Sequence, residues 1–216
     1  MKTKLLMLLV LLGSLWTSNL YAQTRYPKRE FRGAWIQCVN GQFQGMPTEK
    51  MKKVLVSQLD NLQKAGINAI IFQVRAEADA LYKSPYEPWS RFLTGVQGKA
   101  PSPMWDPLQF MIEECHKRNM ELHAWINPYR AKTKGTGALS PMHPYSKNPE
   151  LFVQYAGQLY FDPGLPESRK YICKIVRDIV TRYDVDAIHM DDYFYPYPES
   201  GLRIPDDQTY APVSYT

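Results

Sequence analysis

Several features are scarce in this 216-residue chain, and each absence narrows what the protein can be. It contains three cysteines, Cys38, Cys115 and Cys173, which lie far apart within apolar patterns. An odd, scattered set of this kind predicts buried thiols and argues against a disulfide framework or a zinc site. The sequence also has no internal repeat, low-complexity tract or domain linker. We therefore expect one well-sized core.

Long apolar runs are lacking too. The apolar run at residues 5–12 is well short of the roughly 20 residues that a membrane-spanning helix needs. Two lysines precede it, and Ala22 closes the polar stretch that follows, which is the pattern of a secretory signal peptide. We expect residues 1–22 to be cleaved, leaving a secreted or periplasmic chain from Gln23 without stable membrane insertion. A membrane anchor is the alternative interpretation.

Excess charge of one sign is small. The formal net charge is +5, and loss of the two signal lysines would lower it to about +3. Proteins that bind nucleic acid normally have a concentrated basic face, so we expect no nucleic-acid partner.

Aromatic residues, by contrast, are abundant. They make up 13% of the chain, with fifteen tyrosines and five tryptophans, which exceeds what core packing usually requires. Such a composition suits a carbohydrate-binding cleft. It would equally suit a tyrosine-rich surface for protein contact.

Strand-like and helix-like patterns alternate along the chain. Four short apolar runs have the period of β-strands: residues 32–38, 68–75, 121–127 and 186–191. Three amphipathic helical patterns separate them: residues 48–65, 106–119 and 166–183. This alternation predicts a parallel sheet covered by helices. The strand-to-helix loops are much longer than the helix-to-strand links, so the carboxyl ends of the strands mark the working face.

Local signals predict how the helices begin, end and face the core. Thr48 is the expected N-cap of the first helix and Gly66 its end, and Asp106 caps the second helix ahead of Pro107. The third helix is expected to turn these apolar residues inward: Tyr171, Ile172, Ile175, Val176, Ile179 and Val180.

Alternation within the strands separates a polar face from an aliphatic one. The face predicted to point inward consists of Gly33, Trp35, Gln37, Ile71, Gln73, Arg75, His123, Trp125, Asn127, His189 and Asp191. The opposite face is almost wholly aliphatic and suited to packing against helices. A buried polar group without a partner costs about 1–3 kcal/mol. The convergence of Arg75, Asn127 and Asp191 at the strand ends therefore predicts a site.

Two adjacent carboxylates, Asp191 and Asp192, follow the fourth strand within the segment D-A-I-H-M-D-D-Y-F-Y-P. Glycosidic hydrolysis needs two carboxylates, one to protonate the leaving oxygen and one to attack or to activate water. Adjacent acids at a strand end are also found in solvated loops, helix caps and cation sites.

Four segments together make the chain similar to a known family: RGAWI at 32–36, IIFQVR at 70–75, LHAWINPYR at 122–130 and IHMDDYFYP at 188–196. They resemble the bacterial glycosyl-hydrolase-like ten family, formerly a domain of unknown function numbered 187. The resemblance implies a (β/α)8 TIM barrel of the glycoside hydrolase superfamily, exported to the bacterial envelope, with some members acting on peptidoglycan glycan strands.

The family pattern has eight strand-helix units, and this sequence contains about four. We therefore expect residues 23–216 to be the N-terminal half of such a barrel, truncated after about four strands. In retaining barrel glycosidases the second carboxylate usually comes from a late strand. This chain alone is accordingly expected to be inactive.

Within this framework Asp191 is the predicted general acid/base. The strand alternation points its side chain inward, and it lies at the end of a strand, where such barrels place their catalytic residues. Its alternative role is a structural acid that anchors Arg75 or Arg130. Asp192 would share the chemistry or bind a substrate hydroxyl, and is otherwise a loop cap. No cofactor and no metal ion is expected.

The predicted substrate-binding residues combine aromatic rings with hydrogen-bonding groups: Gln73, Arg75, Glu77, His123, Trp125, Asn127, Tyr129, Arg130, Tyr193 and Tyr195. Aromatic faces complement the C–H faces of sugar rings, although Trp125 suits barrel packing equally well. Asn127 and Arg130 suit sugar hydroxyls or an anionic substituent. Glu77 and Asp79 are alternatively helix caps, and the histidines are alternatively core residues.

The resulting hypothesis is a glycoside hydrolase of an envelope or extracellular polysaccharide. One alternative is a non-catalytic carbohydrate-binding protein that uses the same aromatic face. Another is a metal-dependent hydrolase built on His123, His189 and Asp191.

Overall fold

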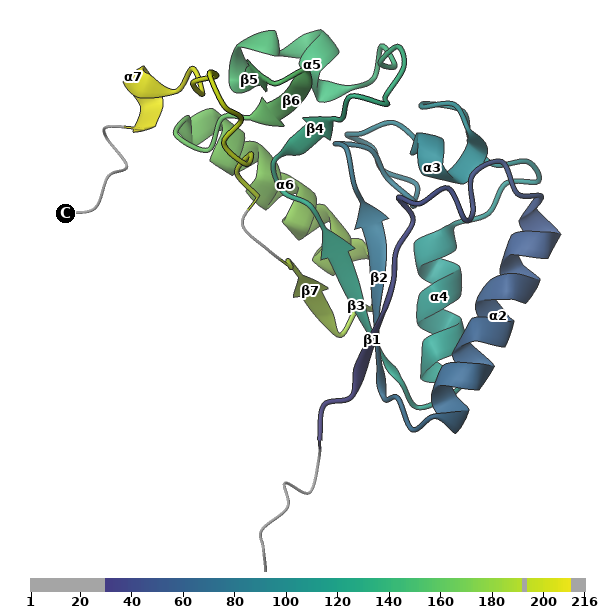
Figure 1. The fold of residues 1–216 in the computed structure, drawn as a ribbon. Helices are drawn as coiled ribbons and strands as arrows, with labels where there is room; N and C mark the ends of the chain where they lie inside the picture. Colours follow the sequence, from purple (N-terminus) through teal and green to yellow (C-terminus); the bar gives the residue numbers. More distant parts are fainter. Residues whose placement is uncertain (1–29, 192–193, 211–216) are drawn as a thin grey trace, which may run out of the picture. The chain divides into compact units, whose positions relative to one another are not determined.

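The computed structural model describes residues 30–191 and 194–210 (Figure 1). Contacts divide the chain into residues 1–31 and residues 32–216, and every helix and strand of the described residues lies in the second unit. The predicted signal peptide, residues 1–22, lies outside the described residues.

A four-stranded parallel sheet forms the centre of the second unit. Its order is β1-β2-β3-β7, and the strands are β1 (Gly33–Ile36), β2 (Ala69–Arg75), β3 (Glu121–Ile126) and β7 (Ala187–His189). All four predicted strands are confirmed, each within a few residues of its expected bounds. Parallel pairing brings their carboxyl ends to one edge of the sheet, as the loop lengths predicted.

Three long helices connect these strands: α2 (Thr48–Lys64), α4 (Pro107–His116) and α6 (Pro166–Arg182). Figure 1 shows α2 and α4 side by side against the sheet. The third helix, α6, comes later in the chain, between the small sheet and β7. The three predicted helices are confirmed. Among the described residues, no helix is long and apolar enough to cross a membrane.

The ends of the helices mostly follow their sequence signals. Asp106 caps α4 by accepting a hydrogen bond from the amide of Gln109 at 3.1 Å. Gly66 ends α2 with φ +83°, a left-handed conformation that favours glycine. The prediction that Thr48 is an N-cap was wrong: the cap is Pro47 with ψ 139°, and Thr48 is the first helical residue. Its hydroxyl contacts the carbonyl of Pro103 at 3.4 Å, so no side chain caps α2.

The main core lies between the aliphatic face of the sheet and the helices. It joins Ile36, Ile70, Phe72, Val74, Leu122, Ala124 and Ile126 of the strands to Met51, Leu55, Leu59, Leu108, Met111, Ile112, Cys115, Ile175 and Ile179 of the helices. Full burial of each large aliphatic side chain stabilises the fold by about 1.5–3 kcal/mol. The prediction that the aliphatic face packs against helices is confirmed for these seven strand residues, but it was wrong for Met190, which the same alternation assigns to this face and which is 45% exposed beyond the end of β7.

Two predictions about α6 were wrong. Val180 is 52% exposed rather than inward, and Cys173 is an exposed free thiol rather than a buried one. The core of α6 is made by Ile172, Ile175 and Ile179, which follow one narrow stripe. Val180 and Cys173 lie beside that stripe, because a helix packed on a sheet buries less of its circumference than its apolar residues alone suggest. Cys38 and Cys115 are buried and free, as predicted.

A second, smaller sheet was not predicted. The strands β4 (Arg130–Lys132), β5 (Phe152–Tyr155) and β6 (Gln158–Phe161) pair antiparallel in the order β4-β6-β5. Ala156 and Gly157 close the β5–β6 hairpin with φ 51° and 74°, as a two-residue turn of the primed kind requires. This sheet has its own apolar cluster, in which Phe161 stacks on Tyr171 of α6 at 5.2 Å between ring centroids.

The remaining elements are short and lie in the loops. They are α3 (Arg91–Thr94), α5 (Pro144–Lys147), the 3₁₀ turn η1 (Pro149–Leu151) and α7 (Asp207–Tyr210). Most of this loop structure follows the carboxyl ends of β2, β3 and β7, where the candidate site lies.

Candidate active site

The inner face of the parallel sheet carries a cluster of aromatic rings. The ring of Trp35 lies 6.0 Å from that of Trp125 and 5.8 Å from that of His189, and the His123 and His189 rings are 6.4 Å apart. These four side chains come from three strands and meet on one face. Their contacts confirm that the alternating polar positions point to the same side of the sheet.

Asp191 stands at the end of β7 and is held by the neighbouring strand. The indole Nε1 of Trp125 donates a hydrogen bond of 2.9 Å to its Oδ1. Trp125 is only 8% exposed, whereas Asp191 is exposed, so a fixed donor orients an accessible carboxylate. Within the described part of the chain Oδ2 of Asp191 accepts no hydrogen bond. One oxygen is therefore positioned and the other is free to meet a ligand.

The histidine beneath Asp191 is biased toward its neutral form. Burial lowers the pKa of His189, the nearby His123 lowers it further, and the carboxylate of Asp191 partly opposes both. His189 therefore serves as a neutral ring packed against Trp35. Among residues 30–191 and 194–210, no three histidine, cysteine or acidic side chains gather closely enough to hold a metal ion. The geometry thus gives the set His123, His189 and Asp191 no support as metal ligands.

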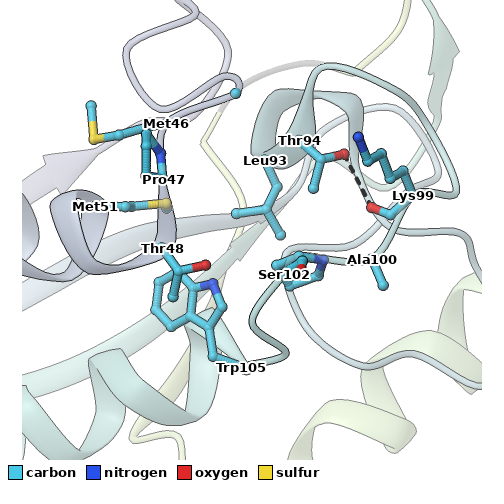
Figure 2. A pocket seen from close by; sticks show the side chains of 12 residues that line it. Met46, Pro47, Thr48, Met51, Leu93, Thr94, Lys99, Ala100, Ser102 and Trp105 are labelled. Carbon is cyan, nitrogen blue, oxygen red and sulfur yellow. Dashed lines mark hydrogen bonds between the residues drawn. The ribbon is translucent and has the colours of Figure 1, made fainter.

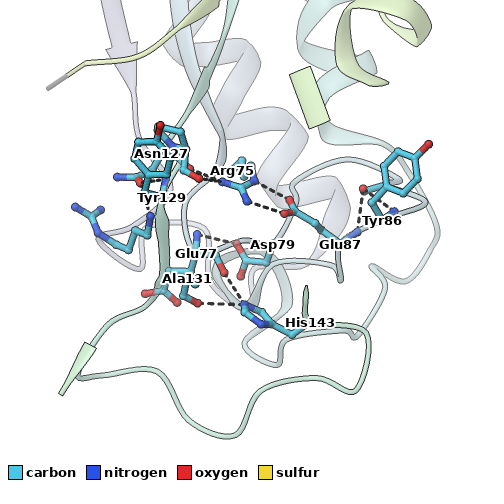
Figure 3. Close-up of polar contacts among 12 residues, drawn as sticks. Arg75, Glu77, Asp79, Tyr86, Glu87, Asn127, Tyr129, Ala131 and His143 are labelled. Atoms are coloured by element: carbon cyan, nitrogen blue, oxygen red, sulfur yellow. Dashed lines mark hydrogen bonds and ion pairs between the residues drawn. The ribbon is translucent and has the colours of Figure 1, made fainter. Parts of the chain in front are cut away.

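Arg75, at the end of β2, forms an ion pair that is completely buried (Figure 3). Its Nε and Nη2 donate to the two carboxylate oxygens of Glu87 at 2.8 and 2.7 Å, and both side chains are 0% exposed. Burial alone would lower the pKa of Arg75, but the charge and hydrogen bonds of Glu87 raise it, so the guanidinium stays charged. The partner of Arg75 is therefore Glu87 and not Asp191.

The same guanidinium holds the turn that follows β3. Its Nη1 donates to the carbonyls of Asn127 and, at 3.1 Å, Pro128. The side-chain oxygen of Asn127 accepts from the amides of Tyr129 and Arg130 at 3.2 and 2.8 Å. Asn127 thus shapes the turn with the oxygen predicted to bind substrate. Tyr129 and Arg130 remain half-buried at the end of that turn.

Glu77, which lies beside Asp79 and His143 in Figure 3, is the centre of a second polar brace. Its carboxylate accepts from Arg91 at 2.9 and 3.0 Å, from Thr133 at 2.6 Å and from Thr136 at 2.8 Å. Burial raises its pKa, but the bonds from Arg91 and the threonines outweigh burial, so the pKa is lowered and the side chain is ionised. Glu77 therefore joins the loop after β2 to the segment after β4.

A buried histidine strengthens this brace. His143 Nε2 lies 3.2 Å from the carbonyl of Glu77 and 3.1 Å from that of Ala131, and Nδ1 accepts from the amide of Tyr145 at 3.1 Å. Because both partners of Nε2 are acceptors, the proton is on Nε2. Burial lowers the pKa of His143, so the ring is neutral and three chain segments meet on it.

Asp79 is a fully buried carboxyl beside Glu77. Burial and then the charge of Glu77 raise its pKa from 3.8 to about 6, while hydrogen bonds from Gln97 and Ser90 oppose that rise. Gln97 also accepts from the amide of Ser140 at 3.0 Å, which extends the network across the loops. Asp79 is therefore a structural acid that is disfavoured in its ionised form.

The other predicted residues are dispersed. Gln73 is buried and its Oε1 accepts from the amide of Cys38 at 3.0 Å, and the hydroxyl of Tyr195 donates to Asp206. Asp192 and Tyr193 lie outside the described residues. Their proposed roles stay predictions.

The partners that organise the site were missed in the sequence. They are Glu87, Arg91, Thr133, Thr136 and His143. No spacing marks them, since they lie in irregular loops. One signal was available: an arginine placed on a buried strand requires a carboxylate partner, and the loop after β2 was the nearest place to find one.

The comparisons with known proteins agree with this architecture. The solved noncanonic maltogenic α-amylase AmyB from Thermotoga neapolitana superposes with a TM-score of 0.50 at 16% identity, over 77% of this chain and 40% of that one. A parallel sheet wrapped by helices, with its polar side chains at the carboxyl ends, is the α/β fold of the TIM-barrel glycoside hydrolases. The predicted fold class is thereby confirmed.

The chain belongs to the family described as Glycosyl hydrolase-like 10, whose profile matches residues 30–215. It is 48% identical over 188 residues to the glycosyl hydrolase YngK of Bacillus subtilis, covering 84% of this chain and 36% of YngK. It is 34% identical over 210 residues to the glycosyl hydrolase DigH of Escherichia coli, covering 88% of this chain and 47% of DigH. The chain thus spans less than half the length of these relatives. The family and the fold together support a glycoside-hydrolase type of function.

The buried ion pair predicts a large loss of stability in the Glu87→Ala variant. Removing Glu87 leaves the guanidinium of Arg75 charged and unpaired in the interior, which costs about 3–5 kcal/mol. Urea denaturation followed by circular dichroism measures the loss. Glu113→Ala, on the exposed face of α4, is the control and is expected to change stability by about 0.5 kcal/mol or less. Equal losses in both variants would contradict the structural role of the pair.

Asp79 predicts a specific pH dependence of stability. Because its pKa is about 6 in the folded state against 3.8 unfolded, folding is favoured by its neutral form, and this stability is lost as pH rises through 6. The Asp79→Asn variant should lack that loss. Between about pH 4 and pH 7 the free energy of unfolding of the natural chain should fall by about 3 kcal/mol relative to the variant. Asp184→Asn, at a fully accessible site, serves as the control, and parallel curves for all three proteins would refute the assignment.

Proposed function

We propose that the protein hydrolyses glycosidic bonds in a polysaccharide of the bacterial envelope, with peptidoglycan glycan strands as the substrate. The chemistry is carboxylate general acid/base catalysis without a cofactor. The observation that carries the proposal is the hydrogen bond from Trp125 to Asp191, which fixes an accessible carboxylate at the end of a barrel strand. Family membership and fold support the reaction class.

Asp191 is the proposed proton-transferring carboxylate. With Oδ1 held by Trp125, Oδ2 is the oxygen that faces the glycosidic bond. Orientation of a catalytic group before reaction lowers the barrier, because its entropy is lost during folding and not during catalysis. The second carboxylate that hydrolysis requires is supplied by Asp192 or by an acid in the part of the longer relatives that this chain does not cover.

Substrate contacts come from the turn after β3 and the segment after β7. Tyr129 and Arg130 stand half-buried at the turn that Arg75 and Asn127 hold, and they offer a ring face and a cation to the glycan. Tyr195 and Tyr193 provide further rings for stacking. The polar groups of Gln73, Arg75 and Glu77 are already hydrogen-bonded within the protein. These residues therefore support the substrate-binding residues and do not bind the glycan themselves.

The proposed place of action is outside the cytoplasm. Residues 1–22 have the lysine-rich start, short apolar run and small closing residue of a secretory signal. Export would bring the protein to the periplasm or cell surface, where envelope glycans are found. Detection of a mature N-terminus at Gln23 in the exported fraction would test this part of the proposal.

The Asp191→Asn variant of the full-length protein should lose its activity. Because a positioned acid or base contributes about 10²–10⁴-fold to the rate, release of sugar fragments from purified peptidoglycan glycan strands should fall by at least that factor. Asp184→Asn, whose side chain is 94% exposed, is the matched control and should retain full activity. Retained activity in Asp191→Asn would show that the catalytic acid is a residue other than Asp191. Glycan binding without cleavage in the natural protein would favour a carbohydrate-binding role instead.

Trp125→Phe should separate positioning from substrate binding. The change keeps a ring on the inner face and removes the Nε1–H that orients Asp191, so kcat should fall about tenfold with little change in KM. The assay is the same, with Trp89→Phe as a partly buried control outside the sheet face. A rise in KM at constant kcat would show that Trp125 binds substrate and does not position the acid.

A further inference from the structure

A small pocket lies apart from the inner face of the sheet, between the start of α2 and the loop that precedes α4 (Figure 2). Its volume is about 170 Å³. The lining residues are Gly45, Met46, Pro47, Thr48, Met51, Leu93, Thr94, Lys99, Ala100, Pro101, Ser102 and Trp105. A cavity of about 150 Å³ accommodates a six-membered ring, so this pocket is large enough for one ring-sized group.

The indole of Trp105 presents its N–H, a hydrogen-bond donor, to this pocket. Trp105 is 9% exposed, and in Figure 2 its nitrogen-bearing edge is turned into the hollow beside Thr48 and Ser102. Within the described residues its Nε1–H has no acceptor, and its ring belongs to the main core, with Phe110 edge-on to it and the ammonium group of Lys52 5.5 Å from its centroid. This donor faces the pocket and is open to an acceptor supplied by a ligand.

The start of α2 adds donors of the same kind. This helix has 17 residues, its N-cap is Pro47, and no side chain caps it. In the described part of the chain the amides of Thr48, Glu49 and Lys50 donate to no other group. Unpaired first-turn amides and the positive end of the helix dipole both favour an anion. Of these three residues Thr48 lines the pocket, so its amide is the one that serves the same space as the indole, and the acid of the first turn, Glu49, does not line it.

The other residues that line the pocket indicate which further properties a ligand should have. No carboxylate lines the pocket, whereas the hydroxyl of Ser102 and the ammonium group of Lys99 at the rim are without partners among the described residues. Met46, Met51 and Leu93 supply an apolar wall. A suitable ligand therefore accepts hydrogen bonds, carries negative charge and has a small apolar face.

We propose that this pocket binds a carboxylate borne by a ring-sized group, as in an acidic sugar unit. The carboxylate would accept from Trp105 Nε1 and the amide of Thr48, and the ring would lie against Met51 and Leu93. A small free carboxylic acid has the same anchoring chemistry, and the experiment below distinguishes the two sources. The proposal does not depend on the hydrolytic activity.

Isothermal titration calorimetry on the purified chain tests the site with three probes: glucuronate, glucose and propionate. Glucuronate should bind at least about tenfold more tightly than glucose, because a hydrogen-bonded charge contributes about 1.5–3 kcal/mol. Propionate weaker than glucuronate identifies a sugar acid as the ligand, and propionate equal to it identifies a free carboxylate. Equal affinities for glucuronate and glucose, or no binding of either acid, would overturn the proposal.

Trp105→Phe is the decisive variant, since it keeps an aromatic ring and removes only the indole donor. It should weaken glucuronate binding about tenfold, while Trp89→Phe leaves it unchanged. Unchanged binding in Trp105→Phe would overturn the proposal. If thermal melting shows that Trp105→Phe is unfolded, the exposed rim variant Lys99→Gln carries the test instead. It should weaken glucuronate about twofold, more at low salt, and leave glucose unaffected.

Discussion

The buried ion pair between Arg75 and Glu87 is the interaction on which the working end of this protein depends. One guanidinium binds a carboxylate from its own loop, two carbonyls of the turn after β3, and the ring of Phe161, 5.8 Å away in β6. Two charges removed from water are tolerated only when their hydrogen-bonding atoms have partners, and here each nitrogen of the guanidinium and each oxygen of the carboxylate has at least one. The pair thereby joins the parallel sheet to the smaller antiparallel sheet and sets the orientation of the turn between them.

Asp191 depends on a different kind of support. It follows β7, which ends at His189, and it is oriented by an indole from the adjacent strand, with which β7 pairs in register. The ring of Trp125 lies 6.0 Å from that of Trp35, and its own burial on β3 means that the carboxylate is oriented by a strand side chain and not by a loop. A site built on sheet elements keeps its geometry more closely than one built on loops alone. The loops around Asp191 are held in place by Glu77 and His143. They determine the shape of the surroundings of the site and do not contribute the catalytic carboxylate.

The fold and the faces of its strands were predictable because periodicity acts locally. The alternation in β1, β2, β3 and β7 identified both the aliphatic core face and the aromatic inner face before any pairing was known. Gly66 and Asp106 marked helix ends through their own backbone and side-chain chemistry. Thr48 was misassigned because its neighbour Pro47 takes the cap position, and Val180 because the sheet covers less of α6 than its pattern implies. The buried Arg75 signalled that a carboxylate partner had to exist, but which residue it is, and which residues bind Glu77, could not be derived, since loop contacts across ten to sixty residues leave no periodic trace.

The turn between β3 and β4 also constrains how the sequence can vary in length. β3 ends at Ile126 and β4 begins at Arg130, and both carbonyls bound by Arg75 lie between them. An insertion there would shift the register of β4 by one residue, exchange its two faces and remove an acceptor from a buried cation. The hairpin tip at Ala156 and Gly157 carries no such contact. Insertions and deletions are therefore excluded from the first turn and tolerated at the second, so the hairpin can diverge in length while the turn that Arg75 holds stays fixed.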